Sequence, residues 1–363
     1  MGRHRQAPQN AAPVPPTLFT HCAPVEAFDE RRTVSATLRR GSAPEAASAQ
    51  LVGASGHNES VTRRGLLLFA GLGIAWGIPY LFIKVAVGEL EPAMVVFARS
   101  ALAAILLLPL AFYRREVMTV LRHWKPMLAY TIVEIVLPWY FLSSAEQKLP
   151  SSTAGLLLAA VPLAGVAVAF ALGRPAKLSG LNWIGILVGM LGVAGLVGLD
   201  IGGSDLPSVL EMSVVVIGYA LGPAILSRWI PDLPGVGVVA VSLAGAALIY
   251  IPVVLLTGSW PTVVPSTSVI VAIVVLAVIC SAVAFLLMVG LIAEIGPVKA
   301  TTITYVNPAV AIIAGVVVLN ERVTVWTVVG FALVLTGSWL VTRKRRDVAA
   351  TSAGPEEVAA RAE

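Results

Sequence analysis

Beyond about residue 62, long apolar stretches alternate with short polar connectors along the chain. We count ten such stretches, each of roughly 20 residues, which is long enough for a helix to cross the hydrocarbon core of a bilayer. Backbone polar groups cannot stay unpaired in lipid, so each stretch is expected to be a helix. The predicted spans are 66–87, 92–113, 126–143, 151–172, 181–199, 207–229, 236–257, 268–292, 297–319 and 324–341.

The composition agrees with a lipid environment. The chain is 57% hydrophobic and 12% charged, with a mean hydropathy of +0.87, whereas soluble domains carry about 25% charged residues. The net charge of +5 does not indicate a nucleic-acid partner, because the basic residues form short runs between apolar stretches. We therefore predict an all-α integral membrane protein whose surroundings are the lipid bilayer.

Two parts of the chain carry the same pattern of proline, tryptophan and glycine. Pro162 precedes Gly185 by 23 positions, and Pro308 precedes Gly330 by 22. A tryptophan lies just before each of these glycines, and a further glycine follows seven positions after each: Trp183 and Gly192 in the first part, Trp326 and Gly337 in the second. The pattern indicates a duplication of a five-span unit.

A unit with an odd number of spans inserts its two copies in opposite orientations, as in many secondary transporters. The predicted architecture is ten transmembrane helices in two inverted five-helix repeats, 63–200 and 206–346. We expect the flanking segments 1–62 and 347–363 to be disordered cytoplasmic tails, since they lack any sustained apolar pattern.

Charge in the connectors predicts the orientation. With a cytoplasmic N-terminus, the basic runs at 63–64, 114–115 and 343–346 lie inside, and only Lys148 and Arg322 fall in outside loops. This asymmetry satisfies the positive-inside rule and places both termini in the cytoplasm of a multi-pass protein of the cytoplasmic membrane. The sequence after Val61 looks like a natural membrane-protein start, so we hypothesise that the native chain begins there, which N-terminal sequencing would test.

Prolines inside the apolar spans are the first functional candidates. Proline removes a backbone donor and kinks a helix, and paired interruptions in two repeats point to a central binding site. The candidate hinges are Pro79, Pro162, Pro223 and Pro308. A Gly-x-x-x-Gly pair precedes both Pro79 and Pro223; for these glycines close helix packing is the favoured interpretation.

Polar residues within the spans are candidates for solute contact. Arg99 and Glu134 lie roughly 10 and 13 Å deep at 1.5 Å per residue. They form either a structural ion pair or a site in which Arg99 holds an anion and Glu134 carries a proton. Lys84 either snorkels to the interface or lines the site. Hydroxyl and amide groups of the ninth span face a solute or neighbouring helices: Thr301, Tyr305 and Asn307. The aromatic candidates are Trp76, Tyr80 and Tyr219.

Several chemistries find no support in the sequence. Cys22 and Cys280 lie in dissimilar contexts, which argues against a disulfide, and all histidines fall outside the apolar spans, which argues against a metal site. No phosphate-binding Gly-Lys-Ser/Thr loop occurs, and Gly71-Leu72-Gly73 lies within a membrane span rather than after a strand. We expect no enzymatic activity, no cofactor and no metal.

The order of these features resembles the drug/metabolite transporter superfamily, and specifically the ten-helix EamA-type permeases. The residues that carry the resemblance are spread from Arg64 to Arg346: Trp76-Gly77 with Lys84, Phe97-x-Arg99, Ser152-Thr153-Ala154-Gly155 through Pro162, Tyr305-x-Asn307-Pro308, and Asn320-Glu321-Arg322. The chain departs from the family where Gly173-Arg174 replaces the usual Gly-Glu after the fourth span, which puts symmetric acidic connectors in doubt.

The resemblance implies transport of a small solute, mostly export of amino acids or metabolites, by alternating access. We therefore expect a secondary transporter for a polar or amphipathic metabolite, with protons as a candidate coupling ion. A homodimer is left open. The alternatives are a membrane sensor or assembly subunit that acts through its tail, and a flippase for a lipid moiety.

Overall fold

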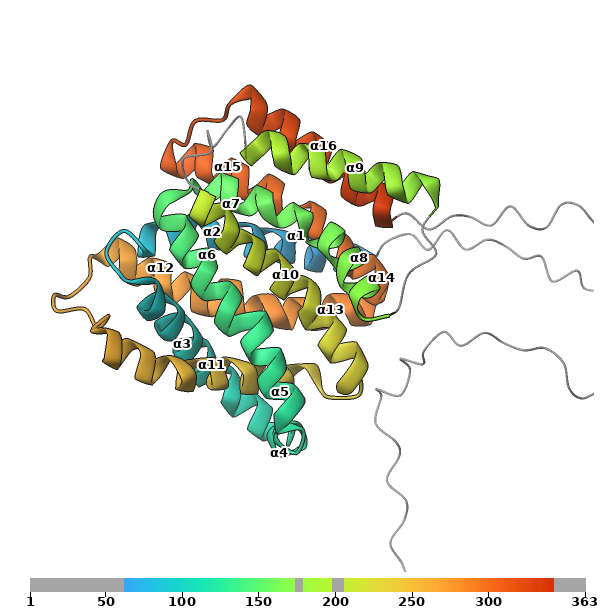
Figure 1. Ribbon diagram of the computed structural model, residues 1–363. Coiled ribbons are helices and arrows are strands. Elements are labelled where there is room, and N and C mark those ends of the chain that lie inside the picture. The colour runs from blue at the N-terminus through green and yellow to red at the C-terminus, as the bar shows by residue number, and fades with distance from the viewer. Residues whose placement is uncertain (1–61, 174–178, 198–205, 343–363) are drawn as a thin grey trace, which may run out of the picture. The chain divides into compact units, whose positions relative to one another are not determined.

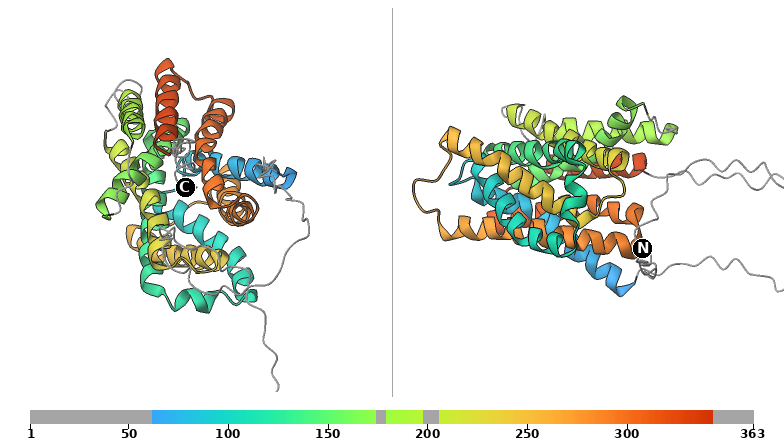
Figure 2. Two further views of the ribbon diagram at one scale, coloured as in Figure 1. Left: turned by 90° about the vertical axis from the view of Figure 1, so that its right-hand side faces the viewer. Right: turned by 90° about the horizontal axis from the view of Figure 1, so that it is seen from below.

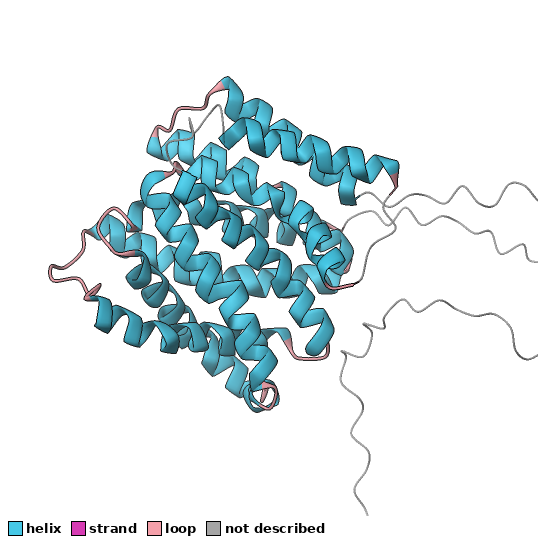
Figure 3. Cartoon of the chain, in the orientation of Figure 1, coloured by secondary structure: helices cyan, strands magenta, loops and turns pink. Residues whose placement is uncertain are grey.

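The computed structural model describes residues 62–173, 179–197 and 206–342, and within them all regular structure is helical (Figures 1 and 3). In the first half the α-helices are α1 Arg63–Gly77, α2 Pro79–Ala86, α3 Pro92–Tyr113, α4 Val117–Leu121, α5 Trp124–Thr131, α6 Leu137–Lys148, α7 Ser151–Leu157, α8 Val161–Ala171 and α9 Gly180–Gly195. In the second half they are α10 Leu206–Trp229, α11 Gly235–Thr257, α12 Thr267–Ala277, α13 Ala284–Ile295, α14 Pro297–Ala300, α15 Asn307–Leu319 and α16 Val325–Thr342. The predicted tails lie outside the described residues.

Nine helical stretches of the described chain are long and apolar enough to cross a membrane, and each coincides with a predicted span. The remaining prediction, 181–199, matches α9, which is shorter, and its predicted end lies outside the described residues. Leu187, Leu255 and Val317 expose 61%, 66% and 72% of their surface. Such exposure of large apolar side chains suits lipid contact. The count of ten stays a prediction.

The third span differs from its prediction at its C-terminal end. We placed the end at Ser143, but α6 continues to Lys148. The segment Ser144-Ala145-Glu146-Gln147-Lys148 has the composition of a connector, yet Ala145 and Glu146 are completely buried. A second unpredicted element is the short helix α4, which lies in the connector after α3.

Helix irregularities occur at corresponding places in the two halves. The third span contains a π-helical segment, Ile132–Val136, and the eighth contains another, Val278–Val283. The fourth and ninth spans each contain a 3₁₀ segment, Leu158–Ala160 and Thr301–Tyr305, just before the helices that hold Pro162 and Pro308. π-helical turns are rare and often mark functional sites.

The two remaining prolines behave differently from each other. The first span is interrupted at Ile78, so that Pro79 is the first residue of α2. Pro223, in contrast, lies inside α10, which is continuous over Leu206–Trp229. The paired interruption that the sequence suggests for the first and sixth spans is therefore present in the first span alone.

Contacts between helices follow the predicted correspondence of the halves. Each of three interfaces joins a helix to its counterpart: α3 with α11, α7 with α15, and α9 with α16 (Figures 1 and 2). The contact of α6, in the third span, with α10, the sixth span, corresponds to the contact of α13, in the eighth span, with α1, in the first span. These main contacts are therefore preserved when the two halves are exchanged, as expected of two repeats.

The glycines that mark the repeat in the sequence lie in the contact between α9 and α16. A β-carbon added to Gly185 would lie 2.8 Å from the backbone oxygen of Gly337, and one added to Gly192 would lie 2.8 Å from the backbone nitrogen of Val334. Small residues let membrane helices approach closely. The two halves therefore place glycines at these positions because α9 and α16 pack too closely there for a larger side chain.

Polar contacts between connectors define two ends of the helix bundle. At one end, which we call the Glu321 end, Lys84 reaches the carbonyl of Leu149, Ser266 donates its amide to Glu89, and Ser151 donates its amide to Glu321. At the opposite end, which we call the Arg64 end, Arg64 lies 3.7 Å from Glu294 and the amide of Gly237 donates to Glu116. The first span runs from the Arg64 end to the Glu321 end, and α10 runs the other way.

Candidate functional site

A buried arginine lies where α3, α6 and the eighth span meet. Arg99 exposes 6% of its surface, and its Nε donates a hydrogen bond to Ser281 Oγ at 3.1 Å. Its guanidinium carbon lies 3.7 Å from the centre of the Trp139 ring, a cation–π contact that strengthens when water is excluded. Ser281 belongs to the π-helical segment of the eighth span, so both halves supply partners to Arg99.

No ion pair joins Arg99 to Glu134, nor to any other acidic side chain among the described residues. The structural alternative raised by the sequence, an ion pair of Arg99 with Glu134, is therefore not observed. The guanidinium is held by a hydroxyl and an aromatic face, both of which are neutral. A positive charge buried in a membrane span without a counter-ion is energetically costly.

Glu134 lies in the other π-helical segment and faces α10. Its Oε2 is buried and has no hydrogen-bond partner in the described structure. A β-carbon added to Gly222 would collide with this carboxyl group, and one added to Gly218 would lie 2.6 Å from the carbonyl oxygen of Val133. The two glycines of α10 thus make room for the π-helical segment and its acid.

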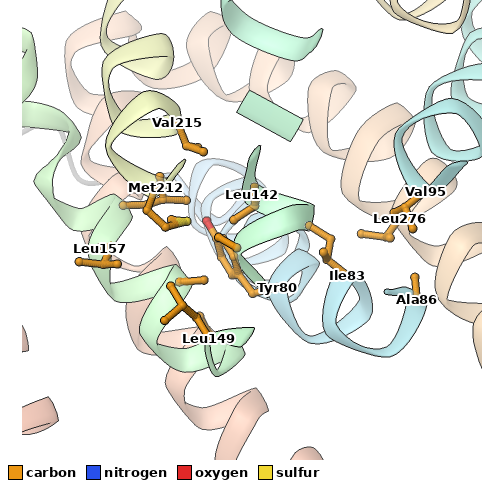
Figure 4. Packing of buried hydrophobic residues seen from close by; sticks show 14 of the residues in the cluster. Tyr80, Ile83, Ala86, Val95, Leu142, Leu149, Leu157, Met212, Val215 and Leu276 are labelled. Carbon is orange, nitrogen blue, oxygen red and sulfur yellow. The ribbon is translucent and has the colours of Figure 1, made fainter. Parts of the chain in front are cut away.

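Two predicted tyrosines lie beside the arginine. Tyr80 exposes 8% of its surface and packs in the largest buried cluster with Met212 and Leu142 (Figure 4). Tyr219, on α10, interacts with the side chain of Trp139. Both tyrosines are close enough to Arg99 to interact with it electrostatically. The structure thus brings Tyr80, Arg99 and Tyr219 together.

Two other predicted residues of the first span have local partners. The Trp76 ring meets Phe285 of α13 edge-to-face, with ring centres 5.8 Å apart. Lys84 Nζ donates to the carbonyl oxygens of Glu146 at 2.7 Å and Leu149 at 3.0 Å. Lys84 therefore caps the C-terminal end of α6, a role that the sequence analysis did not consider.

The ninth-span candidates lie elsewhere. The Tyr305 hydroxyl donates to the carbonyl of Ser338 at 3.2 Å and lies 2.6 Å from Thr342 Oγ1, so it joins α16. This is the neighbouring-helix alternative. The Asn307 Oδ1 atom is buried without a hydrogen-bond partner in the described structure. The side chain of Thr301 lies outside the described part.

The sequence analysis missed Trp139, Ser281 and Glu146 as site residues. Glu146 is completely buried, and both of its carboxylate oxygens lack a hydrogen-bond partner in the described chain. The sequence contains one indication of Glu146: it follows directly after an apolar run, so it belongs to the membrane span if the helix continues beyond that run. Trp139 and Ser281 carry no distinctive sequence signal, because tryptophan and serine are common in membrane helices.

The Glu321 end is tightly packed. Every residue of α7 is buried, and a β-carbon added to Gly155 of α7 would lie 2.5 Å from that of Ala311 of α15. The Glu321 carboxylate accepts hydrogen bonds from the amides of Ser151 and Ser152. Partial burial alone would raise the pKa of Glu321, but the hydrogen bonds from Ser152 and Ser151 outweigh it and lower the pKa below its ordinary value.

A further acid is held at the same end. The amide and side chain of Ser266 hydrogen-bond Glu89 and lower the pKa of its carboxyl group. A surface hollow of about 470 Å³ lies next to it, lined by 89–91 and 258–265. None of the predicted solute-contact residues lines this hollow, so we do not place the solute site there.

Toward the Arg64 end the fourth span is less deeply buried. No residue of α8 is fully buried, and a β-carbon added to Gly165 would meet no atom within 4 Å. α8 still contacts α10 and α16, and most of its residues are half-buried. The fourth span is therefore deeply buried at one end and only partly buried at the other.

Comparison with known proteins identifies the family of this chain. The sequence model of the EamA-like transporter family matches the chain twice, at residues 63–198 and 207–343. The chain belongs to the EamA-like transporter family. The two matches correspond closely to the predicted repeats.

Named relatives of this EamA-like protein are also membrane transporters. It is 31% identical over 281 residues to the uncharacterized inner membrane transporter YedA of Escherichia coli strain K12, covering 74% of this chain and 88% of that protein. It is 23% identical over 299 residues to the uncharacterized transporter YvbV of Bacillus subtilis strain 168, covering 82% and 97%. A solved crystal structure shares the fold, with a TM-score of 0.57 and 21% identity over 78% of this chain and 98% of that one.

The family and its relatives place the EamA-like protein among multi-pass membrane transporters rather than enzymes. Among the described residues there is also no group of histidine, cysteine, aspartate or glutamate side chains that could hold a metal ion. Around Arg99 the structure offers a buried guanidinium, a hydroxyl and an aromatic face.

Proposed function

We propose that this protein is a secondary transporter that moves a small amino-acid-like metabolite, or another polar or amphipathic solute with a carboxylate, across the cytoplasmic membrane. The observation that carries the proposal is Arg99, whose guanidinium is buried between the two halves with neutral partners. A bound carboxylate would supply the missing negative charge. Tyr80 and Tyr219 would offer hydroxyl and ring contacts to the rest of the solute.

Alternating access is the proposed mechanism. The packed α7–α15 contact would close the Glu321 end, and α8, which has no fully buried residue, would offer the solute a route from the Arg64 end. In the other state α7 and α15 would separate and their counterparts at the Arg64 end would close, with Pro162 and Pro308 as hinges next to the 3₁₀ segments. With both termini cytoplasmic, the Arg64 end faces the cytoplasm, and a solute that enters from that end would be exported.

Proton coupling forms part of the proposal, with Glu134 as the proton carrier. Its buried, unpartnered Oε2 lies against α10, a helix of the opposite half. The test uses proteoliposomes with an imposed proton gradient. Gradient-driven accumulation should be lost in Glu134→Gln, while exchange of solute without a gradient should continue. Full accumulation by Glu134→Gln would remove this residue from the coupling step.

The solute class is tested by a thermal-shift screen on purified protein, because a bound solute stabilises the folded state. Amino acids should be compared with the matching amines that lack the carboxylate. We expect stabilisation by some amino acids and none by their amines, and loss of that stabilisation in Arg99→Ala. Equal stabilisation by amine and amino acid would contradict an anion site at Arg99. Stabilisation by long-chain lipid analogues alone would favour the flippase alternative.

A further inference from the structure

Glu146 is the buried acid that the proposed mechanism does not use. It lies near the end of α6, exposes none of its surface, and leaves both carboxylate oxygens without a hydrogen-bond partner in the described part of the chain. Burying an ionised carboxylate without partners costs far more than burying the neutral acid. The surroundings of Glu146 therefore favour a carboxyl group that carries a proton.

The nearest cation does not neutralise Glu146. Lys84 Nζ bonds the main-chain carbonyl oxygens of Glu146 and Leu149, at 2.7 and 3.0 Å. No nitrogen of Lys84 or Arg99 comes within salt-bridge distance of the Glu146 carboxylate in the described structure. The lysine is thus engaged by the end of α6, and the acid beside it stays without a counter-ion.

Other titratable groups surround Glu146 from each neighbouring helix. Those that interact with it electrostatically are Lys84 and Tyr80 of α2, Arg99 of α3, Tyr219 of α10 and Glu321 of the connector before α16. Glu321 is a like charge whose two oxygens are occupied by the amides of Ser151 and Ser152. Lys84 and Arg99 favour the ionised acid while Glu321 opposes it, so the burial of Glu146 without hydrogen-bond partners is what favours the proton.

The position of Glu146 links it to the closed end. It lies on α6 just before the connector to α7, the helix whose every residue is buried. Lys84 holds the last carbonyls of α6, and Glu321 holds the first amides of α7. Separation of α7 from α15 would admit water to this connector, and the carboxylic acid could then release its proton to that water as –COOH becomes –COO⁻.

We propose that Glu146 is a second proton-binding site of this transporter, protonated while the Glu321 end is closed and exchanging its proton with water when that end opens. This inference rests on the alternating-access mechanism proposed above. A proton is the cation that fits, because among the described residues Glu146 belongs to no group of side chains that could supply the several oxygen ligands that a metal ion takes.

Infrared spectroscopy of the purified protein tests the proposal without any solute. The difference spectrum between near-neutral and alkaline buffer, a range in which exposed carboxyl groups stay ionised, should contain a carboxylic acid carbonyl band that is reduced in Glu146→Gln. The matched control is Glu116→Gln, at the Arg64 end, whose carboxylate accepts the amide of Gly237; its spectrum should equal that of the wild type. Superimposable spectra of wild type and Glu146→Gln would overturn the proposal.

A second measurement uses the wild-type chain, so it does not depend on the folding of a variant. Dicyclohexylcarbodiimide, an apolar reagent for protonated carboxyl groups, should label Glu146, and peptide mass spectrometry should locate the adduct. Labelling should fall at least tenfold from acidic to alkaline pH. No adduct at Glu146, or labelling that is constant with pH, would overturn the proposal. A pH-dependent adduct without any solute-induced thermal shift would instead count against the anion site at Arg99.

Discussion

Glu321 binds the backbone amide of Ser151, 170 residues earlier in the chain, at 2.7 Å. Its other carboxylate oxygen accepts the amide of Ser152 at 2.9 Å. These amides begin α7 and have no partner within their own helix, so an acid of the second half caps a helix of the first. The contact lies at the Glu321 end of the bundle, where Gly155 of α7 approaches Ala311 of α15, and it joins the two halves there.

Removal of the Glu321 charge should loosen that end. Glu321→Gln should lower the free energy of unfolding by about 1 kcal/mol, because a charge-assisted cap on two amides becomes a neutral one. The lowered pKa of Glu321 means that its stabilisation is complete above the pKa of the unfolded chain and is lost as the pH falls through the folded-state pKa. Wild type and variant should therefore differ at neutral pH and converge in acid.

Thermal unfolding in detergent across this pH range checks the prediction. Glu294→Gln is the control, since Glu294 holds Thr62 and Arg64 at the opposite end. A difference between wild type and Glu321→Gln that persists unchanged into strong acid would show that the cap is not what stabilises the closed end.

The sequence predicted this fold well and predicted the site in part. Apolar length located nine of the predicted spans because lipid imposes that length directly, while the two-repeat division inferred from Pro162 and Pro308 stays a prediction. Depth along the span, however, says nothing about the direction in which a side chain points around the helix. For that reason Arg99 and Glu134, at similar depth, looked like a pair, whereas the structure turns Glu134 toward Gly222.

Polar residues near a span end caused the other error. The run from Ser144 to Lys148 contains too few apolar residues to extend a span, so Glu146 was assigned to a connector. The structure extends α6 because Lys84 satisfies its terminal carbonyls and the neighbouring helices bury Glu146. Such tertiary caps join residues that are far apart in the chain, and a single sequence does not reveal them.

Two glycines of the fourth span should respond in opposite ways to alanine. Gly155→Ala should destabilise the closed end by about 1–3 kcal/mol, as overpacking does, because the added β-carbon would lie 2.5 Å from that of Ala311. Gly165→Ala is the matched control in the same span, where nothing lies within 4 Å, and should raise stability by up to about 1 kcal/mol, because alanine is the better helix former.

Solvent accessibility gives a readout specific to the closed end. A cysteine at Ser152, which is buried, should react faster with a water-soluble maleimide in the Gly155→Ala background than in the Gly165→Ala background. Equal rates in the two backgrounds would argue that the α7–α15 contact does not control access from the Glu321 end.

Arg99 should tolerate lysine poorly even though the charge is kept. Lysine lacks the planar group that stacks on Trp139 and the Nε that binds Ser281. We expect Arg99→Lys to raise the concentration of carboxylate solute needed for the same stabilisation about tenfold or more, which corresponds to about 1.4 kcal/mol of binding free energy. Ser281→Ala should have a smaller effect in the same direction. Thermal-shift titrations measure both, and unchanged affinity in Arg99→Lys would contradict a specific guanidinium site.

Gly222 and Glu134 provide the most direct test of the geometry between the two halves. A β-carbon at Gly222 would collide with the Glu134 carboxyl group, so Gly222→Ala should cost about 1–3 kcal/mol of stability. The collision needs both side chains. Glu134→Ala should therefore remove most of that cost, and the double variant should be more stable than the sum of the single changes predicts.

Thermal unfolding of the wild type, both single variants and the double variant completes the cycle. An interaction free energy near zero would mean that Glu134 points away from α10. Since the proposed proton carrier depends on that orientation, such a result would also withdraw Glu134 from the coupling mechanism while leaving Arg99 and Glu146 to be judged by their own tests.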